Sequence, residues 1–118
     1  MTDPTASCHC GAVTIRLPKA PLEITHCNCS LCRRYGVLWV YYEIADVVIE
    51  ARQPADTYAW NGKNVDFHRC ADCGCVTHWL PRNSTRKTLG INARLLDPGL
   101  LKPAKINYKD AAGTGLFH

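Results

Sequence analysis

The sequence lacks a long apolar run, and its longest hydrophobic stretches, such as Val37 to Tyr42, hold only a few residues. A membrane-spanning helix needs about 20 predominantly apolar residues in succession, so no such helix and no membrane partner are expected. The N-terminal Met1-Thr2-Asp3-Pro4 has neither a basic start nor an apolar stretch, and it therefore shows no secretory signal. These absences predict a cytoplasmic protein.

A strong excess of one charge is also missing. The chain has 14 basic and 10 acidic residues, a net charge of +4, and the basic residues are dispersed. Proteins that bind nucleic acid usually carry a concentrated basic patch or a recognition helix, so nucleic-acid binding is not expected. With 118 residues, 47% of them hydrophobic, and no internal repeat, the sequence predicts a single domain over residues 1–118. Residues 110–118 are expected to form a loose tail.

Short β-prone runs separated by turn residues make up most of the chain. In the first run, Val13, Ile15 and Leu17 alternate with polar residues, as in a half-buried strand. Further strands are predicted over residues 22–26, 37–42, 47–49, 57–60, 65–69, 76–80 and 88–94. Asn61-Gly62 is typical of a tight hairpin turn, and only Asp97 to Leu101 has the pattern of a helical turn. The fold class is therefore predicted as mainly β, either an all-β sandwich or folded-over sheets.

The chain is rich in cysteine, with eight in 118 residues. Without a secretory signal the compartment is expected to be reducing, and cysteines at short spacings then bind metal more often than they form disulfides. The thiols fall into three clusters: Cys8-His9-Cys10-Gly11, Cys27-Asn28-Cys29-Ser30-Leu31-Cys32, and Cys70-Ala71-Asp72-Cys73-Gly74-Cys75.

Two of the clusters predict a closed structural zinc site. Cys70 and Cys73 form a Cys-x-x-Cys-Gly knuckle, in which the glycine lets the backbone curl toward the sulfurs. Together with Cys8 and Cys10 they supply the four thiolates of a tetrahedral zinc. The alternative is that these residues are free buried thiols.

The middle cluster is different, because Cys27, Cys29 and Cys32 supply three thiolates and no fourth ligand lies beside them. Three protein ligands and one open position are typical of a catalytic zinc. One alternative is a second structural site completed by Cys75 or a histidine. Another is a regulatory cluster that forms disulfides.

Several residues near the clusters have less certain roles from sequence alone. Arg33 and Arg34 follow Cys32 directly and are candidates for holding a substrate carboxylate, although solvated surface arginines are the ordinary case. Cys75 is expected to be an inert buried thiol. The histidines are expected to be surface or satisfied groups, with His9 and His26 adjoining ligands and His68 and His78 in strands. Trp39, Tyr41, Trp60 and Trp79 are expected mostly in the core.

The three clusters in this order resemble the glutathione-dependent formaldehyde-activating enzyme family. The residues that carry the resemblance are Cys8 to Val13, Cys27 to Arg34 and Phe67 to Gly74, with Gly90-Ile91-Asn92-Ala93, Leu96-Asp97 and Leu101-Lys102-Pro103 further along. The resemblance spans about Ser7 to Ile106. It implies the Mss4-like fold, a complex of folded antiparallel sheets stapled by zinc.

The resemblance also implies roles for individual residues. Cys8, Cys10, Cys70 and Cys73 match the structural zinc ligands of the family, and Cys27, Cys29 and Cys32 match the ligands of its catalytic zinc. The implied activity is that of a carbon–sulfur lyase, which condenses formaldehyde with glutathione to S-hydroxymethylglutathione. Position 28 is Asn where many relatives have His. The alternative to an enzyme is a non-catalytic zinc-binding module that binds a protein partner.

Overall fold

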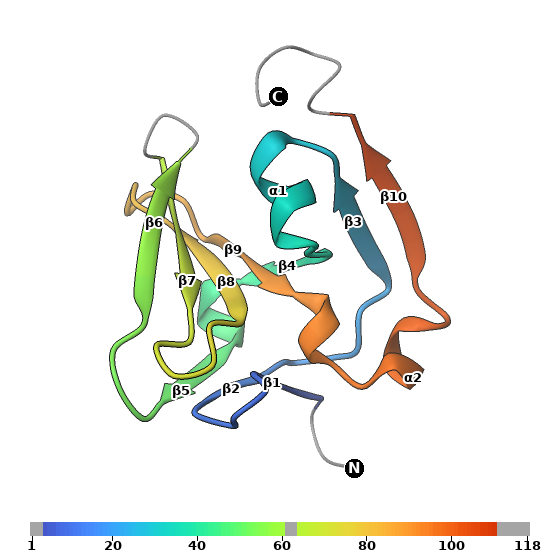
Figure 1. The fold of residues 1–118 in the computed structure, drawn as a ribbon. Helices are drawn as coiled ribbons and strands as arrows, with labels where there is room; N and C mark the ends of the chain where they lie inside the picture. Colours follow the sequence, from blue (N-terminus) through green and yellow to red (C-terminus); the bar gives the residue numbers. More distant parts are fainter. Residues whose placement is uncertain (1–3, 61–63, 111–118) are drawn as a thin grey trace.

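The computed structural model describes residues 4–60 and 64–110 and arranges them in two β-sheets with a few short helices (Figure 1). The strands are β1 (Thr5–Ser7), β2 (Val13–Arg16), β3 (Glu23–Cys27), β4 (Trp39–Glu43), β5 (Val48–Ala51), β6 (Asp56–Trp60), β7 (Val65–Arg69), β8 (Val76–Pro81), β9 (Thr88–Asn92) and β10 (Lys105–Lys109). The helices are α1 (Ser30–Tyr35) and α2 (Pro98–Leu101), with 3-10 turns η1 (Ile44–Asp46) and η2 (Ala93–Leu95). The predicted mainly β fold class is confirmed.

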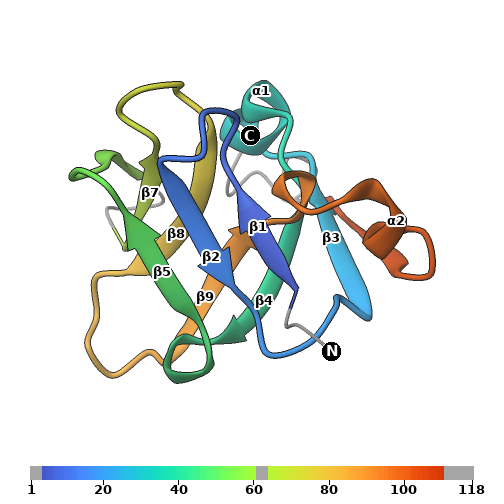
Figure 2. The same cartoon turned by 90° about the horizontal axis from the view of Figure 1, so that it is seen from below.

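The smaller sheet has the strand order β1-β2-β5 and is antiparallel throughout. Figure 2 shows it lying across β4, β8 and β9 of the larger sheet. The alternation predicted for β2 is observed, since Val13 and Ile15 are only 4% and 0% exposed. The hydrophobic core between the sheets includes Ile15, Leu17, Ile24, Leu89 and Ile91. Burial of these side chains therefore fixes how the two sheets pack.

The larger sheet has the order β10-β3-β4-β9-β8-β7-β6. Its neighbours are antiparallel except β10 and β3, which pair in parallel with Lys105 opposite Glu23 and Lys109 opposite Cys27. A wholly antiparallel arrangement was expected, and this edge of the sheet is the exception. Parallel strands need a long connection, and the connection here contains most of the fold. Lysines at both ends of β10 are typical of an edge strand that must not pair with other chains.

Each strand range predicted from the sequence contains a strand, with shifts of one or two residues at the ends. The run predicted over residues 88–94 ends at Asn92, whose side chain accepts a hydrogen bond from the Arg94 backbone N–H at 3.1 Å and starts η2. Strands β6 and β7 pair antiparallel with Trp60 opposite Val65, and the predicted Asn61-Gly62 turn between them lies outside the described residues. The tail predicted from residue 110 also lies outside them, apart from Asp110.

The helical turn predicted at Asp97 to Leu101 is confirmed as α2, with the Asp97 carboxylate accepting from the Gly99 N–H at 2.9 Å. The expectation that no other helix exists was wrong, because α1 follows Cys29. Six residues are too few to show a helical period in a sequence, and α1 forms because both of its ends are capped. Among the described residues, no helix is both long and apolar enough to cross a membrane.

Candidate functional site

The first thiol cluster is assembled from two distant loops. Cys8 and Cys10 lie between β1 and β2, and Cys70 and Cys73 lie between β7 and β8. The Cys10 sulfur lies 3.7 Å from that of Cys8 and 3.6 Å from that of Cys70. Zinc–sulfur bonds of about 2.3 Å in a tetrahedron separate the sulfurs by about 3.8 Å, so the observed spacing fits a zinc ion. The predicted grouping of these cysteines is therefore present in the structure.

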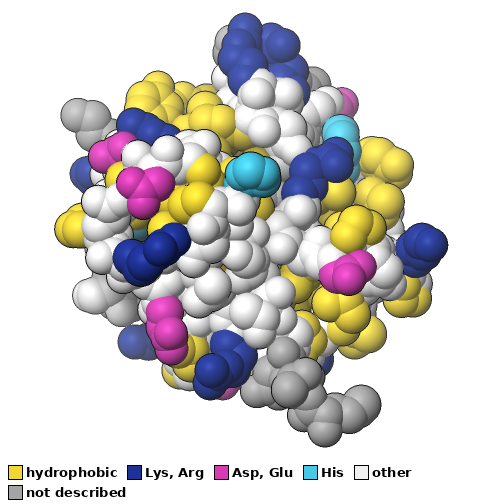
Figure 3. Space-filling model, turned by 60° about the horizontal axis from the view of Figure 1, so that its bottom comes forward, with side chains coloured by type: hydrophobic (Ala, Val, Ile, Leu, Met, Phe, Trp, Pro, Cys, Tyr) yellow, Lys and Arg dark blue, Asp and Glu magenta, His cyan; other side chains and the backbone are white. Residues whose placement is uncertain are grey.

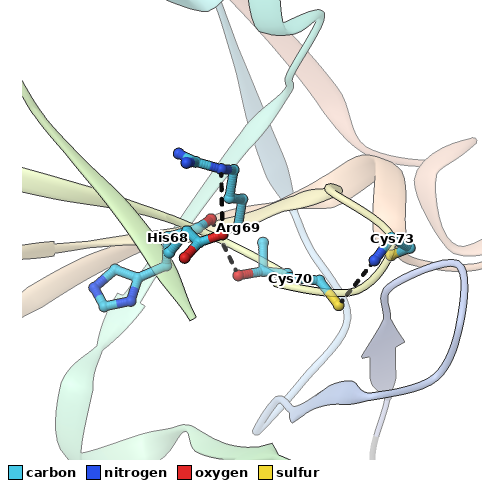
Figure 4. Close-up of polar contacts among 6 residues, drawn as sticks. His68, Arg69, Cys70 and Cys73 are labelled. Carbon is cyan, nitrogen blue, oxygen red and sulfur yellow. Dashed lines mark hydrogen bonds and ion pairs between the residues drawn. The ribbon is translucent and has the colours of Figure 1, made fainter. Parts of the chain in front are cut away.

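Backbone N–H groups surround these sulfurs. The Val13 N–H donates to the Cys8 sulfur at 3.3 Å. The Cys73 N–H donates to the Cys70 sulfur at 3.5 Å, as Figure 4 shows. Gly11 and Gly74 adopt φ angles of 82° and 79°, a conformation that other residues rarely adopt. These glycines therefore let both loops fold back toward the thiols.

The same environment separates the pKa values of these thiols. Backbone N–H groups of Cys75 and Cys10 lower the pKa of the Cys73 thiol to about 5. The Ala12 N–H lowers the pKa of Cys10, but burial and the neighbouring sulfurs outweigh it and raise that pKa to about 11. Binding of a metal ion to these neighbouring thiols would be coupled to the loss of their protons.

The second cluster is local and is built around the start of α1. Cys27 ends β3, Cys29 is the N-cap of the helix, and Cys32 lies in its first turn. The Cys29 sulfur accepts a hydrogen bond from the Cys32 N–H at 3.3 Å. The three sulfurs lie within 4.8 Å of one another, so the predicted set is brought together.

Hydrogen bonds and burial also differentiate the thiols of this cluster. Burial raises the pKa of Cys29, but N–H groups from Cys32 and Leu31 and the neighbouring sulfurs outweigh it and lower that pKa. Burial raises the pKa of Cys32 strongly, although the Trp39 indole N–H donates to its sulfur at 3.3 Å. Cys29 is therefore the first thiol of this cluster to lose its proton.

A cavity of about 570 Å³ opens onto the second cluster. Its lining includes residues of β6, β7 and β8 and residues of β3 and β10, and Figure 1 shows these two groups of strands on either side of α1. The lining side chains are mostly aromatic and basic, apart from the three cysteines. They are Thr25, Cys27, Cys29, Cys32, Trp39, Tyr41, Trp60, Val65, Phe67, Trp79, Arg86, Thr88, Asn107, Tyr108 and Lys109. All three sulfur-bearing residues of the second cluster face this cavity, and none of the first cluster does.

Among the described residues, the cations of the cavity wall are Arg86 and Lys109. Arg33 and Arg34, the predicted carboxylate-binding residues, lie instead on the exposed side of α1, where Arg34 donates to the Ser30 carbonyl at 2.8 Å. Figure 3 shows Lys and Arg side chains in separate groups on one face of the molecule, with Asp and Glu between them. Two basic residues therefore lie on α1 and two others on the described cavity wall.

The β10 strand is tied to the loop of the second cluster. The Asn28 backbone N–H donates to the Lys109 carbonyl at 3.2 Å, and the Asn28 side-chain amide donates to Asp110 at 2.7 Å. Asn28 stands between two of the thiols, so these bonds hold the strand carrying Tyr108 and Lys109 beside the cluster. The side-chain amide of Asn28 therefore contributes directly to the contact with Asp110.

Cys75 belongs to neither thiol set within residues 4–60 and 64–110. It is half-buried rather than fully buried, and its backbone carbonyl accepts from the Cys70 N–H at 2.9 Å. The His9 N–H lowers the pKa of its thiol, but burial and the Cys73 sulfur raise it overall. No histidine of the described segments joins either set.

The remaining histidines have structural surroundings. His68 and His78 stack at 4.4 Å between ring centroids, and the Thr77 hydroxyl lies 2.8 Å from the His78 ring. Burial lowers the pKa of His78 to about 3. His26 packs against the ring of Tyr108 at 5.2 Å. These contacts agree with the expectation that the histidines are satisfied groups.

Sequence reasoning missed the cavity residues. Trp39 is buried as predicted, but Tyr41 is 43% exposed, and both line the cavity with Trp60 and Trp79. Trp39 and Tyr41 are two apart in β4 and therefore share a face, which was the available signal. Arg86 and Lys109 carried no such signal, because they reach the cavity from a loop and from the unpredicted β10.

Comparison with known proteins agrees with this arrangement. The profile of the family described as glutathione-dependent formaldehyde-activating enzyme matches residues 3–110. The chain belongs to this family. The resemblance carried by the three cysteine clusters is thereby confirmed.

The fold also has a counterpart of known structure. A crystal structure of a Rhodobacter sphaeroides protein superposes with a TM-score of 0.68 at 24% sequence identity. The match covers 87% of this chain and 99% of the other. At that identity the likeness shows the shared fold.

Proposed function

We propose that the protein is a zinc-dependent carbon–sulfur lyase that condenses a thiol, glutathione in the first instance, with formaldehyde. The observation that carries this proposal is the difference between the two thiol sets. Cys8, Cys10, Cys70 and Cys73 form a set of four away from the cavity, whereas Cys27, Cys29 and Cys32 form a set of three that faces it. A site with three protein ligands and access to a cavity leaves a coordination position for substrate.

The donor chemistry fits zinc at both sets. Thiolates are ligands that zinc prefers, and the first set has the sulfur spacing of a tetrahedral site. We assign the first set to a structural zinc and Cys27, Cys29 and Cys32 to a catalytic one. When bound there, zinc supplies a Lewis acid that lowers the pKa of a ligated thiol and polarises a carbonyl oxygen.

The chain's own residues prepare the second site in two ways. N–H groups at the start of α1 stabilise the Cys29 thiolate, and the Trp39 indole N–H donates to Cys32 and fixes its sulfur. The aromatic side chains of the wall place apolar surface beside the thiols, where charge interactions are stronger than in open water. Both effects favour holding a thiol and a carbonyl compound at one place.

We propose Arg33 and Arg34 as an exposed pair that attracts the carboxylates of glutathione. Both belong to α1, the helix that also carries Cys32. Charge-assisted hydrogen bonds from guanidinium groups suit carboxylates, and a surface cluster of this kind also raises the rate of encounter. Because a thiol substrate and free cysteines both require a reducing compartment, we place this activity in the cytoplasm.

A second candidate function is a zinc-binding module that binds a protein. Leu22, Ile106 and Tyr108 are 70%, 44% and 76% exposed, and they lie along the β3–β10 edge. Exposed apolar side chains at a sheet edge are a common feature of binding surfaces. Replacing Ile106 with Lys should abolish such binding without changing the thiol chemistry.

The test is the exchange between ¹³C-labelled formaldehyde and its glutathione adduct, followed by NMR at equilibrium. The zinc-loaded protein should speed this exchange above the spontaneous rate, and Cys29→Ser should remove the acceleration. Cys75→Ser is the matched control, because it removes a thiol that belongs to neither set, and it should retain the acceleration. Equal rates with and without the wild-type protein would contradict the proposal.

A further inference from the structure

The cavity beside the second cluster has an aromatic lining that a one-carbon substrate does not need. Trp39 and Phe67 lie 5.9 Å apart between ring centroids, and Tyr41 and Trp79 lie 6.1 Å apart. All four rings line the cavity, and their tilted geometry is that of favourable aromatic pairs. The walls are therefore apolar surfaces that come from β4, β7 and β8 of one sheet.

The position of the Trp79 ring depends on the absence of a side chain at Gly90. Gly90 lies opposite Trp79 in the β8–β9 pair, and a Cβ atom at Gly90 would fall 2.6 Å and 2.8 Å from the Cε2 and Cδ1 atoms of the indole. It would lie closer still to the indole Nε1. The glycine thus provides the space in which the ring lies against β9, and this contact fixes one wall of the cavity.

The size of the cavity exceeds what formaldehyde would fill. A volume of about 570 Å³ is in the range of pockets that enclose drug-sized organic molecules. Arg86 and Lys109 add positive charge to the wall, and the lining residues identified in the described segments include no Asp or Glu. A molecule with an apolar group for the rings and a carboxylate for the cations would complement this wall.

An organic cation is a poor fit, although aromatic cages often bind cations. The Arg86 guanidinium already lies 5.8 Å from the centre of the Trp79 ring and supplies that interaction from the protein itself. Lys109 adds a second positive charge on the same wall. A ligand cation would be repelled by both groups, whereas a neutral aromatic ring would not.

We infer that the enzyme acts on aldehydes with an aromatic or similarly bulky apolar group, in addition to or in preference to formaldehyde. This inference rests on the proposed function. The thiol sulfur forms a bond to the aldehyde carbon, the carbonyl π bond breaks, and the thiol proton ends on the former carbonyl oxygen. The product is a thiohemiacetal, with no change in the overall oxidation level, and its apolar group lies against Trp39, Tyr41, Phe67 and Trp79.

The test compares two stable thioethers, S-benzylglutathione and S-methylglutathione, by calorimetric titration of the zinc-loaded protein. Neither offers a free thiol, so the difference between them measures the aromatic wall alone. We expect the benzyl compound to bind at least about tenfold more tightly, since a phenyl ring buries more apolar area than a methyl group. Equal affinities, or no binding of the benzyl compound at millimolar concentration, would overturn the inference.

Substitutions of the lining aromatic residues test whether the preference for the benzyl compound arises from this wall of the cavity. Trp79→Leu should reduce the benzyl preference to about threefold or less, and Tyr41→Leu should lower it in the same direction. Tyr41 is partly exposed, so its variant gives a reading if Trp79→Leu does not fold. Tyr58→Leu is the matched control, because Tyr58 is an exposed aromatic side chain that is not among the lining residues, and it should keep the full preference. An unchanged preference in both cavity variants would overturn the inference.

Binding measurements with glutathione itself distinguish a failure of this inference from a failure of the proposed function. If glutathione binds in a Cys29-dependent manner but the benzyl group adds no affinity, the lyase proposal stands and the aromatic preference is wrong. If the benzyl preference is present but Cys29→Ser leaves both glutathione binding and formaldehyde exchange unchanged, the lyase proposal fails. In that case the cavity binds apolar ligands without the chemistry, which also overturns the inference about aldehydes.

Discussion

The two thiol clusters of this protein are made of the same side chain and differ in how the chain brings them together. The first joins Cys10 to Cys70, which are 60 residues apart, and its backbone donors come from two separate loops. The second lies within β3 and α1, and it faces a cavity. A set that joins distant parts of the chain contributes to the stability of the fold, whereas a local set can face a cavity with little loss of stability.

Breaking the first cluster should have the largest effect. Cys70→Ser removes a proposed zinc ligand that is only 2% exposed and lies in the β7–β8 loop, with its sulfur 3.6 Å from that of Cys10 in the N-terminal loop. We expect a loss of at least about 3 kcal/mol in the free energy of unfolding, because metal binding and folding are coupled at such sites. Cys29→Ser should cost about 1 kcal/mol or less, since Ser is itself a good N-cap for α1. Chemical denaturation of both variants measures this, and equal losses would contradict the distinction.

Stepwise metal removal sharpens the same comparison. A chelator titrated into the protein should take one zinc from the second cluster while the far-ultraviolet circular dichroism stays unchanged. The spectrum should collapse only when the second zinc leaves, because that metal closes the long loop. Zinc release is followed with a colorimetric indicator. Simultaneous loss of both metals together with the fold would show that the clusters are not independent.

The exposed arginines of α1 test the charge at the second cluster. Replacing Arg33 and Arg34 with Ala should weaken glutathione binding by about 1 to 3 kcal/mol, the scale of lost charge-assisted hydrogen bonds. The matched control replaces Arg16 and Lys19 near the smaller sheet, which removes the same charge away from α1. Calorimetric titration measures both double variants. Equal weakening in the two would assign the effect to net charge alone.

A smaller effect on stability concerns the stacked His68 and His78 of β7 and β8. Burial and the neighbouring His68 hold the pKa of His78 at about 3, below its ordinary value of 6.5. The unfolded chain therefore binds a proton that the folded chain excludes, and stability is present above about pH 6.5 and lost as pH falls toward 3. Between about pH 7.5 and about pH 5, the wild type should lose about 2 kcal/mol more than His78→Gln. Parallel slopes for the two proteins would contradict this assignment.

The cysteine loops and most of the strands could be predicted from the sequence. The spacing of Cys70 and Cys73 before Gly74 and the pair Cys8 and Cys10 before Gly11 specify tight loops, and these loops are observed. Alternation of apolar residues located the strands, because a sheet with one buried face has a period of two residues.

The rest depended on tertiary contacts that leave little local signal. The α1 helix has only six residues and exists because of Cys29 at its start and Gly36 at its end. Strand β10 has lysines at both ends, and its partner β3 lies about 80 residues earlier, so neither composition nor proximity indicated the pair. The cavity could not be predicted from spacing or composition, because its described lining comes from seven strands, helix α1 and a loop.

The most direct test of the difference between the clusters is the absorption spectrum of the protein with Co²⁺ in place of zinc. Glutathione should change the charge-transfer and ligand-field bands of wild type in a saturable way, because its thiolate enters the open position of the second cluster. Cys75→Ser should respond as wild type does, while Cys29→Ser should bind Co²⁺ only at the first cluster and show no change on adding glutathione. A wild-type spectrum that does not change, or a full response in Cys29→Ser, would contradict the assignment of a closed first site and an open second one.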